Sequence, residues 1–265
     1  MESQKIIHVV LIDYFKAARV VESIKTIRSQ AYNQSNIHIT VIDNSCNSRN
    51  FMALQELLEF EVNLIEAKSN IGYIAAANMA VKSEIVPSDI VLLLNPDIII
   101  NDPNTLVGVI KNFDDPLCYI VGPAQVNDDG TKPSIARGYP TLSALISKRT
   151  ILGKTRWGER KVSEYMLSHF DPRKKQTVPW LQSSCVFIRK SYWEQVDGLN
   201  SKYFLFMADI EVCKKAYDHG GYVLYDPTHI AIADGKRCSE GGITALFKSS
   251  ALRKHVADAF KYYTS

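Results

Sequence analysis

Four acidic or amide side chains stand at the ends of apolar segments in the first hundred residues of this 265-residue chain. They are Asp13, Asp43, Asn95 and Asp97. Taken singly, such a residue ends a strand and caps the next helix. Several of them on one edge of a parallel sheet predict a shared binding crevice, where a carboxylate could hold a divalent cation against phosphate oxygens.

The segment 90–100 (IVLLLNPDIII) is the most apolar of these stretches. A run that is apolar on both faces predicts a buried central strand, parallel to its neighbours. Pro96 cannot donate a ladder hydrogen bond, so regular pairing should stop near it. Asp97 then emerges at the carboxyl edge of the sheet, where a charge is costly unless it has a partner.

Alternating strand and helix patterns predict an α/β fold with a mostly parallel sheet and flanking helices. Strands are expected at 6–12, 37–42, 62–65, 90–100, 178–189 and 222–233. Helices are expected at 20–31, 51–60, 74–80, 192–196, from 208 onward, and at 243–262. The segment 137–179 is too long for a plain loop, so it predicts either a substrate-facing lid or a helical insertion.

A second candidate centre lies in the segment 203–213 (YFLFMADIEVC). Asp209 falls in the first turn of the helix expected there. It is either an N-terminal cap favoured by the helix dipole or a general base framed by aromatic side chains. Asp226, His229 and Asp234 are the competing bases farther along the chain.

Composition excludes several classes of protein. The net charge of +3 is too small to indicate nucleic-acid binding. Five widely spaced cysteines without a C-x-x-C pair argue against a disulfide framework or a zinc site and for a reducing compartment. No signal peptide or membrane span is visible, so a soluble, cytoplasmic protein is expected. The G-x-G-x-x-G and P-loop phosphate motifs are absent, so a bound nucleotide would need another counter-charge, such as a cation at Asp97.

Several longer segments, taken in order, are similar to one enzyme family. They are ITVIDNSCNSRN (39–50), NIGYIAAANMA (70–80), LLLNPDIII (92–100), IARGYPTLSALI (135–146) and the stretch from VPWLQSSC to LYDP (178–227). The chain resembles the inverting GT-A glycosyltransferases of family 2, in particular the bacterial rhamnosyltransferase-like members of O-antigen and capsule assembly. The resemblance covers nearly the whole chain and implies a Rossmann-like GT-A sheet.

The resemblance implies roles for individual residues. Asp209 would be the catalytic base, and Asp97 would contact a Mg²⁺ or Mn²⁺ ion that bridges the donor diphosphate. Together with the strand ends, it implies substrate binding by Asp13, Asp43, Asn70, Gly72, Asn78, Asn95, Arg137, Trp180, Gln182 and Glu211.

Two positions depart from the family pattern. Ala208 replaces the glutamate that normally precedes the base, and Ala233 replaces a metal-binding histidine. Either Asp234 substitutes as an oxygen ligand, or the metal is held by Asp97 and the phosphates alone.

These observations predict one GT-A domain over residues 1–240, divided at 123/124 into nucleotide-sugar and acceptor halves. The basic amphipathic segment 241–265 either docks on that domain or makes peripheral contact with an anionic inner membrane. The expected function is inverting sugar transfer, with rhamnose from dTDP-rhamnose favoured over a UDP-linked donor, to a hydroxyl of a surface glycan or a lipid-linked glycan.

Two alternatives are weighed against this function. A nucleotidyltransferase would need a basic phosphate-binding signature near the N-terminus, and none is present. A non-catalytic partner of a polysaccharide assembly complex remains open because of Ala208 and Ala233.

Overall fold

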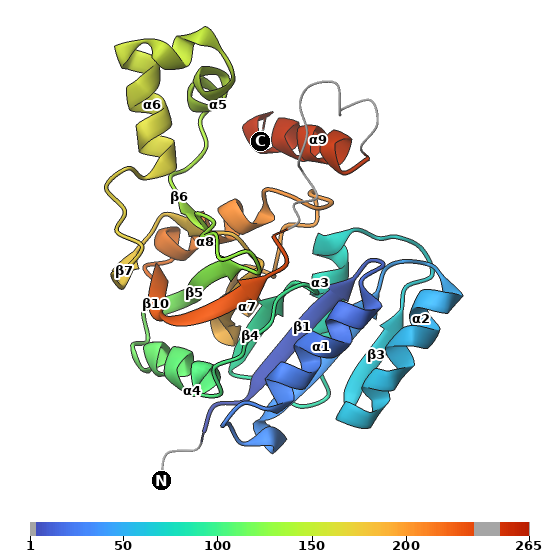
Figure 1. The fold of residues 1–265 in the computed structure, drawn as a ribbon. Helices are drawn as coiled ribbons and strands as arrows, with labels where there is room; N and C mark the ends of the chain where they lie inside the picture. Colours follow the sequence, from blue (N-terminus) through green and yellow to red (C-terminus); the bar gives the residue numbers. More distant parts are fainter. Residues whose placement is uncertain (1–3, 236–249, 265) are drawn as a thin grey trace.

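The computed structural model describes residues 4–235 and 250–264, and a mixed sheet forms its centre (Figure 1). The sheet order is β3-β2-β1-β4-β9-β5-β10-β7. Its strands are β1 (Ile7–Asp13), β2 (Ile37–Asp43), β3 (Val62–Glu66), β4 (Ile90–Leu94), β5 (Cys118–Asn127), β7 (Gln176–Thr177), β9 (Cys185–Arg189) and β10 (Tyr222–Ala233). A separate two-stranded ribbon pairs β6 (Ala136–Arg137) with β8 (Trp180–Leu181).

Most neighbouring strands run parallel, as the alternating pattern predicts. β9 is antiparallel to both β4 and β5, and β7 is antiparallel to β10. Because β9 is antiparallel to both of its neighbours, β4 and β5 point in the same direction. Strand β10 is parallel to β5 and therefore points in that direction too. The carboxyl ends of β1, β2, β4, β5 and β10 therefore share one edge of the sheet.

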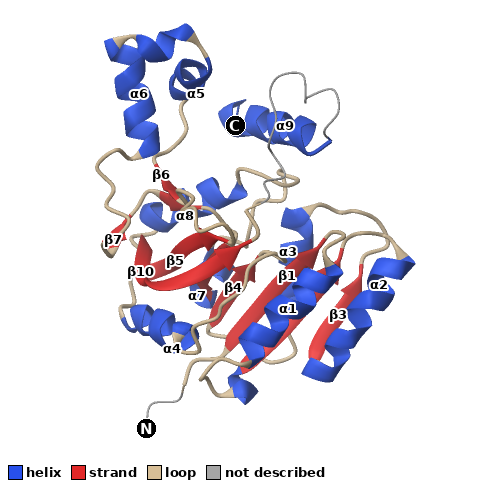
Figure 2. Cartoon of the chain, viewed as in Figure 1, coloured by secondary structure: helices blue, strands red, loops and turns tan. Residues whose placement is uncertain are grey.

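Helices cover both faces of the sheet, as Figure 2 shows. They are α1 (Ala17–Arg28), α2 (Ser48–Leu54), α3 (Tyr73–Lys82), α4 (Thr105–Ile110), α5 (Leu142–Arg149), α6 (Arg156–Met166), α7 (Lys190–Gln195), α8 (Ala208–Asp218) and α9 (Ser250–Thr264). Short 3₁₀ helices are η1 (Gln34–Asn36), η2 (Gln55–Phe60), η3 (Lys111–Asp114) and η4 (Ile151–Lys154).

Two apolar clusters, one on each face, hold these layers together. One packs α1 and α2 against the sheet through Val20, Ile24 and Leu54. The other packs α3 and α8 through residues such as Ile74 and Ile210. Every residue of β1 and β4 is buried, which explains why their sequences are apolar on both faces. The α/β prediction is confirmed.

Several predicted boundaries are wrong. β4 ends at Leu94 rather than Ile100, because Pro96 cannot continue the ladder. The expected strand 178–189 is broken into β8 and β9 by a loop, and the expected helix 51–60 becomes α2 followed by η2.

The segment 137–179 contains a helical insertion, in which α5, η4 and α6 project from the body of the molecule (Figure 1). The predicted helix 243–262 falls partly on residues 236–249, which lie outside the described residues, and α9 begins at Ser250. The proposed division at 123/124 falls inside β5. No helix within the described ranges is long and apolar enough to cross a membrane.

Candidate active site

A backbone bridge between Ile99 and Ile232 brings two carboxylates together at the carboxyl edge of the sheet. Each of these two residues donates its N–H to the other's carbonyl oxygen at 2.8 Å. In an antiparallel pair, the residue two positions before Ile99 stands opposite the residue two positions after Ile232. Asp97 therefore stands opposite Asp234, although the two are far apart in the sequence.

Lys16, in the loop between β1 and α1, reaches this carboxylate pair. Its Nζ lies 2.9 Å from Asp234 Oδ2 and 3.7 Å from Asp97 Oδ1. Burial raises the pKa of Asp97, the Lys16 charge opposes that change, and the neighbouring Asp234 reinforces it. Two carboxylates that share a partly buried position repel each other unless a cation neutralises them.

The pair fits a hard divalent cation. Carboxylate oxygens are the donors that Mg²⁺ and Mn²⁺ prefer, and these already converge on a cation, the Lys16 ammonium. Within residues 4–235 and 250–264, no group of three or more His, Cys, Asp or Glu side chains is arranged to hold a metal. Phosphate or water oxygens would therefore have to complete the coordination supplied by Asp97 and Asp234.

Asn50 donates hydrogen bonds to both of the aspartates that end β1 and β2. The parallel register places Asp13 beside Asp43, and both carboxyls are fully buried. Asn50 Nδ2 donates to Asp13 Oδ2 at 2.6 Å and to Asp43 Oδ1 at 3.0 Å. Burial raises the pKa of Asp13, although the Asn50 hydrogen bond opposes this. Asp43 Oδ2 is buried with no hydrogen-bond partner among the described residues, which is unusual for a carboxylate oxygen.

A second set of amide contacts joins the loop after β2 to the start of α3. Asn44 donates to Asn70 Oδ1 at 3.1 Å and accepts the backbone N–H of Ile71 at 3.0 Å. Asn70 Oδ1 also accepts from the Gly72 N–H at 3.0 Å. Gly72 has φ of +83°, and a Cβ there would lie 2.6 Å from the Phe204 carbonyl oxygen. Only glycine lets α3 begin this close to Phe204.

Asp209 lies in the first turn of α8, beside the loop between β8 and β9. Its carboxylate accepts the backbone N–H of Ile210 at 3.0 Å and a hydrogen bond from the backbone of Ser183. The same loop is fixed to the end of β4, because Asn95 donates its backbone N–H to the Ser184 carbonyl at 2.8 Å. Asp209 is thus held beside the carboxyl end of β4.

Burial raises the pKa of the Asp209 carboxyl from 3.8 to about 6. Hydrogen bonds from backbone N–H groups favour the charged form, but desolvation exceeds their effect. A general base is most effective when its pKa is close to the operating pH. Asp209 is therefore ionised at neutral pH and more basic than an exposed aspartate.

Helix α9 holds the segment that leads into α8. Asp258, which is 1% exposed, accepts the backbone N–H groups of Phe204, Leu205 and Phe206 at 2.9 to 3.2 Å. The next residue, Met207, has φ of +73°. A left-handed conformation costs a non-glycine residue on the order of 1–3 kcal/mol, and it persists only where surrounding contacts enforce it. Asp258 supplies three of those contacts.

Two predicted substrate-binding residues are engaged by the protein itself. Asn78 donates to the Leu199 carbonyl at 2.7 Å and accepts the Leu199 N–H at 2.9 Å. Burial opposes ionisation of Glu211, but hydrogen bonds from Asn200 and other neighbours outweigh it and lower the Glu211 pKa to about 2. Both side chains secure loops around the site, and their contact with substrate stays a prediction.

Three other predicted residues lie on or beside the β6–β8 ribbon. Trp180 is buried and donates its indole N–H to the Gly138 carbonyl at 2.8 Å. Arg137 lies over the Tyr165 ring with its Cζ 5.8 Å from the centroid, and its buried Nε has no hydrogen-bond partner among the described residues. Gln182, half-buried, follows β8. These side chains border the α5–α6 insertion. Their contact with the donor sugar or with the acceptor substrate also stays a prediction.

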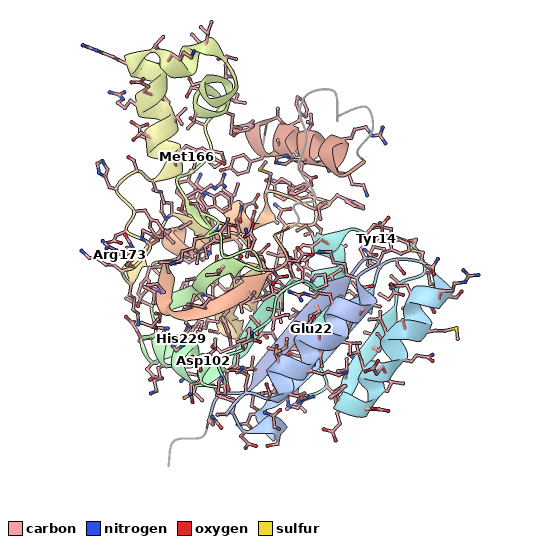
Figure 3. The ribbon with its side chains drawn as sticks, in the orientation of Figure 1. Tyr14, Glu22, Asp102, Met166, Arg173 and His229 are labelled. Carbon is pink, nitrogen blue, oxygen red and sulfur yellow. The ribbon has the colours of Figure 1, made fainter. Side chains whose placement is uncertain are left out.

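The competing bases Asp226 and His229 lie elsewhere, at a cavity of about 520 Å³ beside α4. Figure 3 labels His229 on that side of the molecule. Asp226 accepts from Asn112 and Thr228, which outweigh the effect of burial and lower the Asp226 pKa. A carboxyl with a lowered pKa and satisfied oxygens is a poor general base.

Three residues of the site were missed by sequence reasoning. Asn50 belongs to the quoted segment 39–50, whose polar end could have indicated it. Lys16 is the basic residue three positions after Asp13, a position from which a side chain can return to the strand ends. Asp258 is an acidic residue in a basic helix, and its inward orientation has no local signal.

The geometry can be compared with known proteins. No protein-family model matches the sequence. A mannosyltransferase from Pyrobaculum calidifontis, solved with GDP-Man and Mn²⁺, superposes with a TM-score of 0.64 over 98% of this chain and 65% of its own, at 16% identity. GalNAc-T7 with UDP, GalNAc and Mn²⁺ gives 0.65 over 91% of this chain and 46% of its own, at 14% identity. The chain has the GT-A fold.

Similarity in sequence is weaker than similarity in fold. An N-acetylglucosaminyl-diphospho-decaprenol L-rhamnosyltransferase of Mycobacterium tuberculosis is 25% identical over 177 residues. The match covers 63% of this chain and 57% of that enzyme. The GT-A chain described here thus spans little more than half of the curated relative that it matches.

Proposed function

We propose that this chain transfers a sugar from a nucleotide-diphosphate donor to a hydroxyl group of a glycan. The observation that carries the proposal is the grouping of Asp97, Asp234 and Asp209 at the carboxyl edge of a GT-A sheet. The mycobacterial relative is named as a rhamnosyltransferase and the Pyrobaculum protein as a mannosyltransferase, which supports the same reaction class.

The nucleobase would lie against the buried pair Asp13 and Asp43. Asp43 Oδ2 offers an acceptor without a protein partner among the described residues, and uracil and thymine both present an imide N–H that could satisfy it. Asn50 keeps both carboxylates in place. Asn70 and Gly72 would line the side of the pocket next to the ribose.

The diphosphate would bind between the strand ends and Lys16. Asp97 and Asp234 would hold a divalent cation, which when bound supplies positive charge for the departing diphosphate. Lys16, already within 3.7 Å of both carboxylates, would add its own charge beside the phosphates. Asn95 fixes the loop that separates this position from Asp209.

Asp209 would act as the general base. Its carboxylate would remove the proton of the acceptor hydroxyl, whose oxygen attacks the anomeric carbon opposite the leaving diphosphate and inverts its configuration. Positioned proton transfer of this kind accelerates reactions by about 10²–10⁴-fold. The pKa of about 6 suits this role at neutral pH.

Rhamnose from dTDP-rhamnose is the donor we propose first, because the mycobacterial relative is named as a rhamnosyltransferase. The proposed acceptor is a growing bacterial surface glycan, such as one of O-antigen or capsule, in lipid-linked form. Its lipid would place the protein at the inner membrane face, with α9 in peripheral contact.

Nucleotide release from a panel of nucleotide-sugars, with and without Mg²⁺ or Mn²⁺, tests this proposal. Release of dTDP from dTDP-rhamnose that rises when a diphosphate-lipid-linked sugar is added supports it. No release from any dTDP-, UDP- or GDP-linked sugar, with donor binding intact, would favour a non-catalytic partner instead.

A further inference from the structure

We infer that the tip of the α5–α6 insertion docks onto an anionic phospholipid bilayer. The tip patch consists of Ile146, Ile151, Leu152 and Trp157 with the basic residues Lys154 and Arg156. Ile151 is 80% exposed, and Trp157 is 50% exposed. Exposed apolar side chains this close together in the chain are unusual on a free surface, and such patches mark sites of contact with another protein or a membrane.

The residue types in the tip patch suit a lipid interface. Tryptophan combines an apolar ring with a polar N–H and is favoured at the boundary between headgroups and acyl chains. Ile151 and Leu152 lie on η4, the turn between the two helices, so they can insert without exposing a long stretch of backbone. Lys154 and Arg156 alternate with them and can reach lipid phosphates.

Charge favours an anionic bilayer over a second copy of this chain. Residues 141–166 contain six basic and two acidic residues. One of the acidic residues, Glu164, is within ion-pair distance of both Arg160 and Lys161, nearer the base of the insertion. Two tips brought together would oppose like charges, whereas anionic headgroups neutralise them.

The placement of the insertion suits such docking. Figure 1 shows α5 and α6 projecting from the sheet, with the turn between them farthest from it. Helix α9 lies on the same side of the sheet in that view, and its Val256 and Phe260 side chains are exposed. The insertion is rooted next to Arg137 on β6, so a docked tip would hold this border of the site toward the bilayer.

This inference extends the proposed function by naming the membrane surface that would present a lipid-linked acceptor. It is tested without sugar transfer, by sedimentation with phosphatidylglycerol–phosphatidylcholine vesicles and by tryptophan fluorescence. Trp180 and Trp193 are each 5% exposed, so a blue shift on vesicle addition reports on Trp157. We expect binding that weakens as salt rises or as phosphatidylglycerol is omitted.

Two tip variants should each reduce vesicle affinity by roughly ten-fold or more: Ile151→Ser with Leu152→Ser, and Lys154→Glu with Arg156→Glu. Matched controls are Ile85→Ser, which removes an isoleucine that is 87% exposed in the segment between α3 and β4, and Lys82→Glu on α3. Both controls should bind as the wild type does. Melting curves should be unchanged in all four proteins, because every altered side chain is exposed.

Absence of vesicle binding at low salt overturns the inference, and so does equal binding by the wild type and the tip variants. A wild-type dimer in solution that the tip substitutions dissociate would assign the patch to a second copy and likewise overturn it. Donor binding, followed separately by thermal shift, should be the same in the tip variants. If the proposed function is wrong, the thermal shift will show no donor binding by the wild type, and the vesicle result will not be affected.

Discussion

Ile99 and Ile232 exchange two backbone hydrogen bonds of 2.8 Å, and this bridge sets Asp97 opposite Asp234. The bridge exists because the chain leaves the sheet after Leu94 and crosses to the end of β10. At Ala233, where the glycosyltransferases that the sequence resembles have a histidine, this chain has alanine, and Asp234, one residue later, stands opposite Asp97. On this basis we propose Asp234 as the second oxygen ligand, in preference to a cation held by Asp97 alone.

Replacing Lys16 with methionine should strengthen the binding of Mn²⁺. The Lys16 ammonium lies within 3.7 Å of both carboxylates and would compete with a divalent ion for their oxygens. Without it, mutual repulsion of Asp97 and Asp234 favours the metal, by roughly ten-fold in dissociation constant. Isothermal titration of Mn²⁺ measures this directly. Lys16→Arg keeps the charge and should retain wild-type affinity; weaker binding by Lys16→Met would contradict the assignment.

Replacing Asn50 with alanine should destabilise the protein more at pH 7.5 than at pH 5. The substitution leaves Asp13 and Asp43 buried without their shared donor, which costs roughly 1–3 kcal/mol. Burial already raises the pKa of Asp13, and loss of the donor raises it further. Protonation at low pH therefore relieves part of the cost.

Urea denaturation at the two pH values measures the difference for Asn50→Ala. Asn63→Ala is the control, because its side chain bonds only weakly to Ser83 Oγ at 3.4 Å and touches no buried carboxylate. An equal loss of stability at both pH values would show that Asn50 does not act through these carboxylates.

Replacing Asp209 with asparagine should raise the melting temperature at pH 7.5. The folded-state pKa of about 6 lies above the ordinary value of 3.8, so the folded protein binds a proton more tightly than the unfolded chain. Ionisation therefore lowers stability as pH rises through this window. The neutral amide removes that penalty, and the gain should be small at pH 4, where the carboxyl is largely protonated in the folded state. A lower melting temperature at pH 7.5 would contradict this account of the buried carboxylate.

Replacing Asp258 with alanine should change how the proposed base titrates. Without the three backbone contacts, the 204–206 segment loosens and Asp209 gains access to water. The pH at half-maximal turnover should then fall from near 6 toward the value of an exposed aspartate, with turnover reduced about ten-fold.

The pH–rate profile of Asp258→Ala separates this positioning role from a general loss of folded protein, which would lower turnover without moving the profile. Lys261→Met is the control, because the exposed Lys261 lies 3.8 Å from Asp258 and does not hold the 204–206 backbone; its ammonium donates to the Lys202 carbonyl oxygen. An unchanged profile in Asp258→Ala would assign Asp258 to stability alone.

Local patterns in the sequence were enough to predict most of the fold. β1, β2 and β10 carry apolar runs, α1 repeats its apolar residues at helical spacing, and turn-forming residues separate the elements. The same patterns predicted that Asp13, Asp43 and Asp97 would share one edge, because parallel strands end together.

Contacts between distant segments could not be predicted in this way. The 99–232 bridge joins a segment after β4 to the end of the last strand, and no local pattern specifies that pairing. The resemblance placed Asn78 at the ligand but gave no sign that both ends of its amide bind the backbone of Leu199. The inward orientation of Asp258 depends on how α9 packs, which periodicity alone does not give.

Turnover of a nucleotide-sugar by the wild type and by Asp209→Asn tests the central claim most directly. The donor's nucleotide release is measured at pH 7.5 with Mn²⁺ and an acceptor, and donor affinity is measured in parallel. We predict that Asp209→Asn binds the donor as the wild type does but loses about 10²-fold or more in turnover. Full turnover by Asp209→Asn would contradict the assignment of Asp209 as the base and, with it, the proposed mechanism.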